Sequence, residues 1–228
     1  MAKKRVTRKQ LLKEPDEFIT FTGKLIRFGR QHDKEITYAA CAFFIIVIAL
    51  VAFRFFSNRA ESTASDLLRQ AMQKYETQRN DTDAQQAFTE AGPDFEYILD
   101  KYPNKPAGKM AGVIYANLNY EAGETDTAIR LFEKALNDTT EDGGYRNLIL
   151  SSLGYAYEQK GDIKTAVTYF EGIADNENPI GKDVALFNLG RLYAEMGEST
   201  KSQAAYNRLV SEFQDSVYYD LVNEKLAG

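Results

Sequence analysis

Apolar side chains follow a helical period along most of the chain, and one uninterrupted apolar run lies near its beginning. Between Glu35 and Arg54, 18 residues carry no charge. At about 1.5 Å per residue, a helix of this length covers about 27 Å, close to the roughly 30 Å hydrocarbon core of a bilayer. The pattern therefore predicts one transmembrane helix over 36–56.

The same run differs from a cleaved signal peptide. Such a signal has an apolar region of about 7–15 residues near the N-terminus, whereas this run is longer and begins at Ile36. The small residues at 62–64 that could mark a cleavage site lie beyond the end of the run. The span is therefore expected to remain as an anchor. Cys41, the single cysteine, lies inside the run, so no intramolecular disulfide can form.

After the span, the chain repeats one pattern of apolar and small residues. The pattern at 153–157 recurs 36 residues later at 189–193, and glycine–acid pairs follow at 161–162 and 197–198. This order of features predicts an antiparallel helix pair. A first helical face is followed by a glycine that can end the helix in the left-handed conformation, and then by a second helical face. Equivalent aromatic residues of four successive second helices are Phe95, Phe132, Phe170 and Tyr206.

This pattern resembles the tetratricopeptide repeat family, in which a two-helix unit recurs about every 34 residues. The resemblance covers about 62–214 and implies an all-α solenoid of about four helical hairpins. The first hairpin matches only in its second helix, and 80–86 are expected to form a longer turn. Because one hairpin cannot bury its own apolar face, the hairpins must stack. Residues 216–226 are expected to form a C-terminal capping helix over the last apolar face.

Charge divides the chain into a basic head and an acidic body. Residues 1–35 carry ten Lys or Arg and five Asp or Glu, a net charge of +5, while the whole chain has −5. Basic residues gather on the cytoplasmic side of membrane spans. The chain is therefore expected to have a cytoplasmic segment (1–35), a transmembrane helix (36–56) and an extracytoplasmic repeat domain (57–228).

The basic head contains a predicted amphipathic helix after Pro15. Its role is open between an amphipathic helix on anionic lipid and a docking segment for another membrane complex. Nucleic-acid binding by the basic arm at 3–13 is a third interpretation, but the topology signal already explains a basic run beside a span. The apolar face of the predicted helix is formed by Phe18, Phe21, Leu25 and Phe28.

The repeat resemblance implies a concave groove lined by the first helix of each hairpin. In one binding mode of the family, lysines and asparagines clamp the terminal carboxylate of a peptide. Asn117 fits that mode, but the lysines are missing. The groove is instead expected to be apolar and aromatic, which suits extended or partly unfolded apolar segments, unless its aromatics belong to the core between hairpins. Carried over by the family's offsets, the expected lining is Val113, Asn117, Tyr120, Ser151, Tyr155, Glu158, Val184, Phe187 and Arg191.

The sequence contains no recognisable catalytic arrangement. His32 is the one histidine, and no CxxC pair, phosphate-binding glycine loop or GxSxG nucleophile motif occurs. We therefore predict no enzymatic activity, no cofactor or metal, no nucleic acid and no small-molecule substrate. The expected partners are proteins, with membrane lipid around 36–56.

The layout carries a second resemblance. A short basic head, one span and an extracytoplasmic repeat domain resemble the bacterial family of membrane-anchored ancillary subunits of the Sec translocon. This resemblance implies an inner-membrane protein with a periplasmic domain, acting as a scaffold or co-chaperone beside the translocon and a membrane-anchored periplasmic chaperone. The alternative is an envelope-assembly or cell-division factor that binds cell-wall or outer-membrane machinery, because a fold alone does not fix a function.

Overall fold

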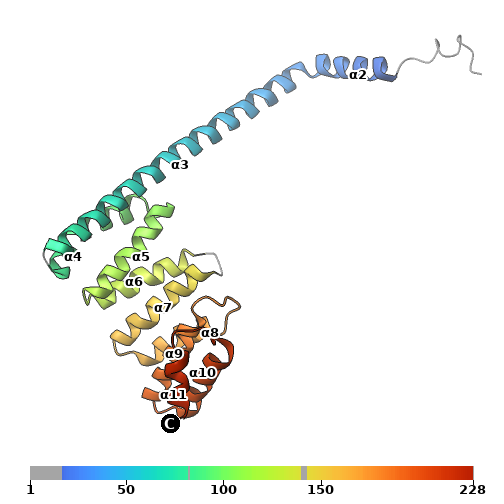
Figure 1. Cartoon of the computed structure of the whole chain (residues 1–228). Helices are drawn as coiled ribbons and strands as arrows, with labels where there is room; N and C mark the ends of the chain where they lie inside the picture. Colours follow the sequence, from blue (N-terminus) through green and yellow to red (C-terminus); the bar gives the residue numbers. More distant parts are fainter. Residues whose placement is uncertain (1–16, 82, 140–142, 228) are drawn as a thin grey trace, which may run out of the picture. The chain divides into compact units, whose positions relative to one another are not determined.

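The computed structural model describes residues 17–81, 83–139 and 143–227, and every regular element within them is a helix. The chain divides into two compact units, Met1–Asn58 and Arg59–Gly228. The N-terminal unit holds α2 (Glu17–Gln31) and the beginning of α3 (Asp33–Asp81) (Figure 1). The predicted basic arm at 3–13 lies outside the described residues.

The beginning of α3 carries the apolar run. This helix is long and apolar enough to cross a membrane, as judged by length and composition, and none of its most apolar window is buried within the protein. Large side chains such as Phe43, Ile48 and Phe53 are exposed. Exposure of so much contiguous apolar surface to water is unfavourable. It is typical of a segment that is surrounded by lipid.

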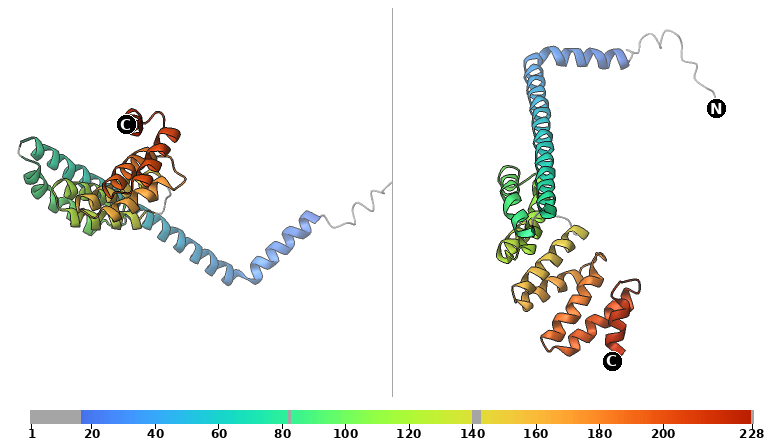
Figure 2. Two further views of the ribbon diagram at one scale, coloured as in Figure 1. Left: turned by 90° about the horizontal axis from the view of Figure 1, so that it is seen from below. Right: turned by 60° about the vertical axis from the view of Figure 1, so that its left-hand side comes forward.

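The C-terminal unit consists of antiparallel helix pairs that follow one another along the chain, as Figures 1 and 2 show from three sides. The predicted solenoid of four hairpins and a final capping helix is confirmed. After the rest of α3, the helices are α4 (Ala84–Lys101), α5 (Pro106–Glu121), α6 (Thr125–Asn137), α7 (Gly144–Gln159), α8 (Ile163–Ala174), α9 (Lys182–Glu195), α10 (Ser199–Glu212) and α11 (Tyr219–Ala227).

Glycines make the tight turns inside three of the hairpins. Gly123, Gly161 and Gly197 have φ values of 81°, 83° and 77°, in the left-handed region that glycine enters without steric cost. The amides that follow Gly161 and Gly197 donate back to carbonyls of the preceding helix, such as Asp162 N to Tyr157 O at 2.9 Å. The predicted role of the glycine–acid pairs in ending first helices is confirmed.

Close contact between the two helices of a hairpin depends on further glycines. A Cβ added at Gly154 would lie 2.7 Å from the ring of Phe170, and one at Gly190 would overlap the ring of Tyr206. The absence of a side chain on the first helix therefore lets an aromatic ring of the second helix lie directly against the backbone. Gly154 and Gly190 occupy equivalent positions in the repeated pattern of 153–157 and 189–193, so the pattern places both close approaches.

Aromatic residues of the second helices form the core. Phe95, Phe132 and Phe170 are at most 1% exposed. The second helices α6 and α8 each contact the first helix of their own hairpin and that of the next, as α6 does with α5 and α7. Burial of each phenylalanine therefore joins two hairpins, and removing one such side chain typically costs about 3–5 kcal/mol.

Two sequence predictions about the ends of the solenoid were wrong in detail. The longer turn expected at 80–86 does not form, because α3 continues to Asp81 and α4 begins at Ala84. Asp83 caps α4 by accepting a 2.8 Å hydrogen bond from Gln86 N, which satisfies a free amide of the first turn. The capping helix begins at Tyr219 rather than at residue 216, and its Val222 is fully buried.

Candidate functional site

The predicted groove residues lie on the three first helices α5, α7 and α9, but they differ in accessibility. Val113 is 6% exposed and belongs to the core beside Phe132, so its side chain is not offered to a partner. Asn117 is exposed, and its Nδ2 donates only to the local carbonyl of Val113. The partly exposed residues are Tyr120, Ser151, Tyr155, Glu158, Val184, Phe187 and Arg191.

Four polar side chains of α7 and α9 form a connected network, here called the inner polar cluster: Tyr155, Glu158, Asn188 and Arg191. The guanidinium of Arg191 donates two hydrogen bonds to the Glu158 carboxylate, at 2.6 and 2.7 Å. It also donates to Asn188 Oδ1, and Asn188 Nδ2 donates to the Tyr155 hydroxyl at 2.9 Å. The cluster joins two neighbouring hairpins through charged and polar groups.

The charge of Glu158 acts on its surroundings. Its hydrogen bonds raise the pKa of Arg191 above the ordinary value, so the guanidinium stays charged. Burial raises the pKa of the Tyr120 hydroxyl on α5, and the nearby Glu158 carboxylate raises that pKa further. A partly buried ion pair beside a neutral tyrosine is therefore present where the sequence predicted an apolar and aromatic lining.

Replacement of Arg191 by methionine is expected to lower the free energy of unfolding by about 1 kcal/mol at low salt, and by less in high salt. The effect is modest because the Arg191 side chain is 38% exposed and solvent screens the pair. Urea unfolding of Arg191→Met, Glu158→Gln and the double variant measures the coupling energy.

A matched control is Lys160→Met, which removes an ion pair between Lys160 and Asp126 of the neighbouring hairpin. Both of these side chains are more exposed than Glu158 and Arg191, so no measurable loss of stability is expected. A coupling energy of zero between Glu158 and Arg191 at low salt would contradict the structural role assigned to the inner polar cluster.

The C-terminal end of the predicted lining is covered by the chain itself. The ring of Phe187 stacks on Tyr218 with centroids 4.2 Å apart, and Ser216 Oγ donates a 2.7 Å hydrogen bond to Asp183. The segment before α11 therefore occupies the face of α9 that the family offsets assign to a ligand. Tyr155 is also engaged, with its ring edge-on to Phe170.

The other end of the row of first helices is open. A groove of about 630 Å³ lies between α3 and α5, here called the α3–α5 groove. Met110 is 55% exposed, and it shares a face of α5 with Ile114 and the exposed Asn117 by i, i+4 and i+7 spacing. The groove is lined by Glu61, Ser65, Leu68, Arg69, Met72, Gln73, Glu76, Pro106, Ala107, Met110 and Ile114.

Glu61 links the two walls of the α3–α5 groove. Its Oε1 accepts a 3.1 Å hydrogen bond from Ala107 N in the first turn of α5. The side chain of the N-cap residue Lys105 makes no capping hydrogen bond to this turn. A carboxylate is favourable there because helix amides point toward it. Within the described chain, the buried Oε2 has no hydrogen-bond partner, and an unpaired buried acceptor of this kind is unfavourable.

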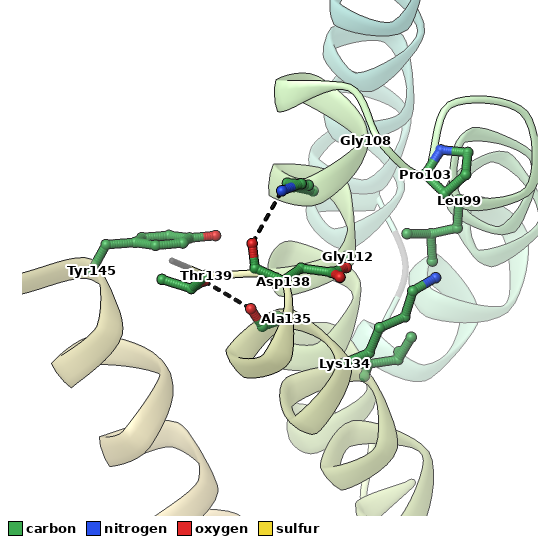
Figure 3. A pocket seen from close by; sticks show the side chains of 11 residues that line it. Leu99, Pro103, Gly108, Gly112, Lys134, Ala135, Asp138, Thr139 and Tyr145 are labelled. Carbon is green, nitrogen blue, oxygen red and sulfur yellow. Dashed lines mark hydrogen bonds between the residues drawn. The ribbon is translucent and has the colours of Figure 1, made fainter. Parts of the chain in front are cut away.

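A second cavity lies among α4, α5, α6 and the start of α7 (Figure 3). Figure 3 shows a hydrogen bond beside it, from Thr139 Oγ1 to the Ala135 carbonyl. The Nζ of Lys109 donates another to the Asp138 carbonyl. Its volume of about 40 Å³ accommodates a few water molecules. The α3–α5 groove is therefore the better candidate for a protein segment.

Sequence reasoning missed the α3–α5 groove. The first helix of the first hairpin lacks the repeated glycine and aromatic residues, so the family offsets could not be carried onto α3. One signal in the sequence could have indicated the groove, namely the helical spacing of Met110, Ile114 and Asn117. This spacing places two apolar side chains on the same helix face as Asn117, a predicted lining residue. Among the described residues, no group of three or more His, Cys, Asp or Glu side chains is arranged to hold a metal ion.

Comparison with known proteins identifies the repeats. The family model described as "Tetratricopeptide repeat-like domain" matches residues 27–228. No curated protein matches the sequence.

Solved structures share the fold at low sequence identity. A tetratricopeptide repeat protein from Parabacteroides merdae is 17% identical, with a TM-score of 0.56 over 71% of this chain and 59% of its own. BtubC from P. vanneervenii is 16% identical, with a TM-score of 0.54 over 75% and 81% of the two chains. PilF of Pseudomonas aeruginosa is 15% identical, with a TM-score of 0.51 over 75% and 84%. At such identities the likeness establishes the fold alone.

Proposed function

Since the chain belongs to the tetratricopeptide repeat-like domain family, we propose that its hairpins form a protein-binding scaffold tethered to a bacterial inner membrane. The helices of such repeats present extended surfaces rather than a closed catalytic pocket. The single observation that carries the proposal is the α3–α5 groove, because one of its walls belongs to the same helix as the apolar run.

The proposed topology follows from charge. Residues 36–56 cross the bilayer, and the ten basic residues at 1–35 keep the N-terminus in the cytoplasm. Residues 57–228 then lie in the periplasm. Glu61 follows Phe56 by five residues, so chain length alone keeps the α3–α5 groove within a few nanometres of the membrane surface.

The chemistry of the groove suits apolar segments of varied sequence. Met72 and Met110 have flexible, polarisable side chains that adapt to different apolar partners. The exposed Glu76 adds an acceptor for backbone or side-chain donors at the groove wall. A partly unfolded segment that emerges beside the span would meet both features. The place where such segments emerge through this membrane is the Sec translocon, and we place the scaffold or co-chaperone there.

Photo-crosslinking in native membranes tests this proposal. Probes replace Met110, which lines the groove, and Asn117, which lies on the same face of α5. A matched control probe replaces Tyr97, which is 50% exposed on α4, outside both the lining and that face. We expect translocon subunits, a membrane-anchored chaperone or nascent periplasmic proteins to be captured at Met110 and Asn117, with several-fold lower yield at Tyr97.

Two results would contradict the proposal. Equal yields at Met110 and Tyr97 would show that the α3–α5 groove is not the binding surface. Capture of cell-wall enzymes or outer-membrane assembly proteins at Met110, without translocon subunits, would replace the translocon with the alternative of an envelope-assembly or cell-division factor.

A further inference from the structure

The helix α2 presents an apolar face that no described part of the chain covers. Its side chains are described from Phe21 onward. Phe21, Leu25 and Phe28, which share this face, are between 58% and 64% exposed, and Ile26 on another side of the helix is 60% exposed. Phe28 contacts the ring of His32, with centroids 4.7 Å apart, yet it stays largely exposed. Large apolar side chains gathered on one helix usually mark a surface that is covered in the working protein.

The cationic side chains of α2 lie outside its apolar arc, on a surface that also holds Ile26. At about 100° per residue, Phe21, Leu25 and Phe28 fall within an arc of about 60°, and Arg27 and Arg30 lie on the other side of the helix. Lys24 flanks the apolar arc. Within Glu17–Gln31 there are three basic residues and one acid, Glu17, a net charge of +2. An apolar face with one cation at its edge and two more on the polar side matches the acyl boundary and the anionic headgroups of a bilayer.

The position of α2 in the chain points to the same ligand. It ends at Gln31, α3 begins at Asp33, and the apolar run starts at Ile36. This step rests on the proposed function, because it uses the proposed bilayer around 36–56. If that run crosses the bilayer, α2 is anchored within a few residues of the lipid surface, where lipid is present at a far higher concentration than any single protein partner.

We propose that α2 lies in the headgroup region of the cytoplasmic leaflet. Its apolar face enters the acyl boundary and Lys24, at the edge of that face, contacts anionic phosphate headgroups. Arg27 and Arg30 on the other side add attraction to the anionic surface. The ligand is a lipid surface that contains anionic phospholipid, rather than a protein groove. Helices of this composition lie in the plane of the interface with their apolar side buried about 5–10 Å deep.

The test uses tryptophan fluorescence, because the chain contains no tryptophan and one substitution gives a unique reporter. The full chain is reconstituted into vesicles that contain phosphatidylglycerol and brominated phosphatidylcholine. Leu25→Trp reports on the apolar face of α2. Gly23→Trp is the matched control, since it lies on the opposite face two residues away and nothing lies within 4 Å of an added Cβ. Ile46→Trp reports on the middle of the proposed span.

We expect the bromines to quench Leu25→Trp about threefold more than Gly23→Trp, with a blue-shifted emission. Bromines near the headgroup should quench Leu25→Trp best, whereas bromines deep in the acyl chain should quench Ile46→Trp best. Replacing Lys24, Arg27 and Arg30 together by glutamine, or phosphatidylglycerol by neutral lipid, should reduce the quenching of Leu25→Trp.

Failures of the two proposals are distinguishable. Equal quenching of Leu25→Trp and Gly23→Trp, with Ile46→Trp still quenched, would overturn the placement of α2 and leave the span intact. Absence of quenching at Ile46→Trp would overturn the membrane tether itself. A Leu25→Trp reporter that is shielded only in native membranes, and stays accessible in pure lipid vesicles, would show that α2 binds a protein instead.

Discussion

Replacement of Gly108 by alanine is expected to lower the free energy of unfolding by about 3 kcal/mol or more. Gly108 lies in the first turn of α5, and a Cβ there would overlap the carbonyl oxygen of Tyr102 and lie 2.8 Å from its carbon. These are backbone atoms, so no side-chain rotation relieves the clash. The link between α4 and α5 must move, and with it the Lys105 N to Tyr102 O hydrogen bond of that turn.

The control for this prediction is Gly172→Ala. Gly172 is an exposed residue inside α8, and nothing lies within 4 Å of an added Cβ. Alanine should therefore stabilise the protein there by about 0.5–1 kcal/mol, because glycine loses more backbone entropy in a helix. Urea unfolding of the full chain in detergent, followed by circular dichroism, compares the two variants. A Gly108→Ala variant as stable as Gly172→Ala would contradict the packing described between α4 and α5.

Release of the repeat domain from its proposed span is expected to reduce partner capture at Met110 by about 100-fold. The proposed groove makes apolar contacts of modest extent, and its partners are proposed to lie in or near the membrane. A tether turns their encounter into a local event at high effective concentration. In the test variant, a cleavable signal peptide replaces residues 1–56, and the crosslink yield at Met110 is measured in membranes.

The matched control exchanges the uncharged residues at 36–53 for an unrelated apolar sequence of the same length. Capture should be retained, because the proposed role of the span is to hold the domain near the membrane. Unchanged capture by the released domain would show that the groove binds strongly enough without a tether. Loss of capture in the exchanged variant would show that the side chains of the span contact the partner directly.

The surface of the repeats was predicted less well than their arrangement. The family offsets select positions on α5, α7 and α9, but they do not show which of these positions other segments of the same chain cover. Val113 is buried beside Phe132, and Phe187 is covered by Tyr218. Arg191 and Glu158, which lie 33 positions apart, form the ion pair of the inner polar cluster. Such pairings depend on how far one hairpin is rotated on the next, which no local pattern records.

The amino-acid sequence by itself determined most of the helices, the glycine turns inside the hairpins and the apolar run. These features are local: Gly161 and Gly197 end helices through their own backbone freedom, and the run at 36–53 is apolar whatever surrounds it. The tertiary structure alone decided which surface is open. At the α3–α5 groove, Glu61 of α3 accepts a hydrogen bond from Ala107 N of α5, 46 positions along the chain. At the C-terminal end of the predicted lining, the ring of Tyr218 stacks on Phe187 and covers it. Contacts of this kind depend on packing between distant segments, so periodicity along the chain could not predict them.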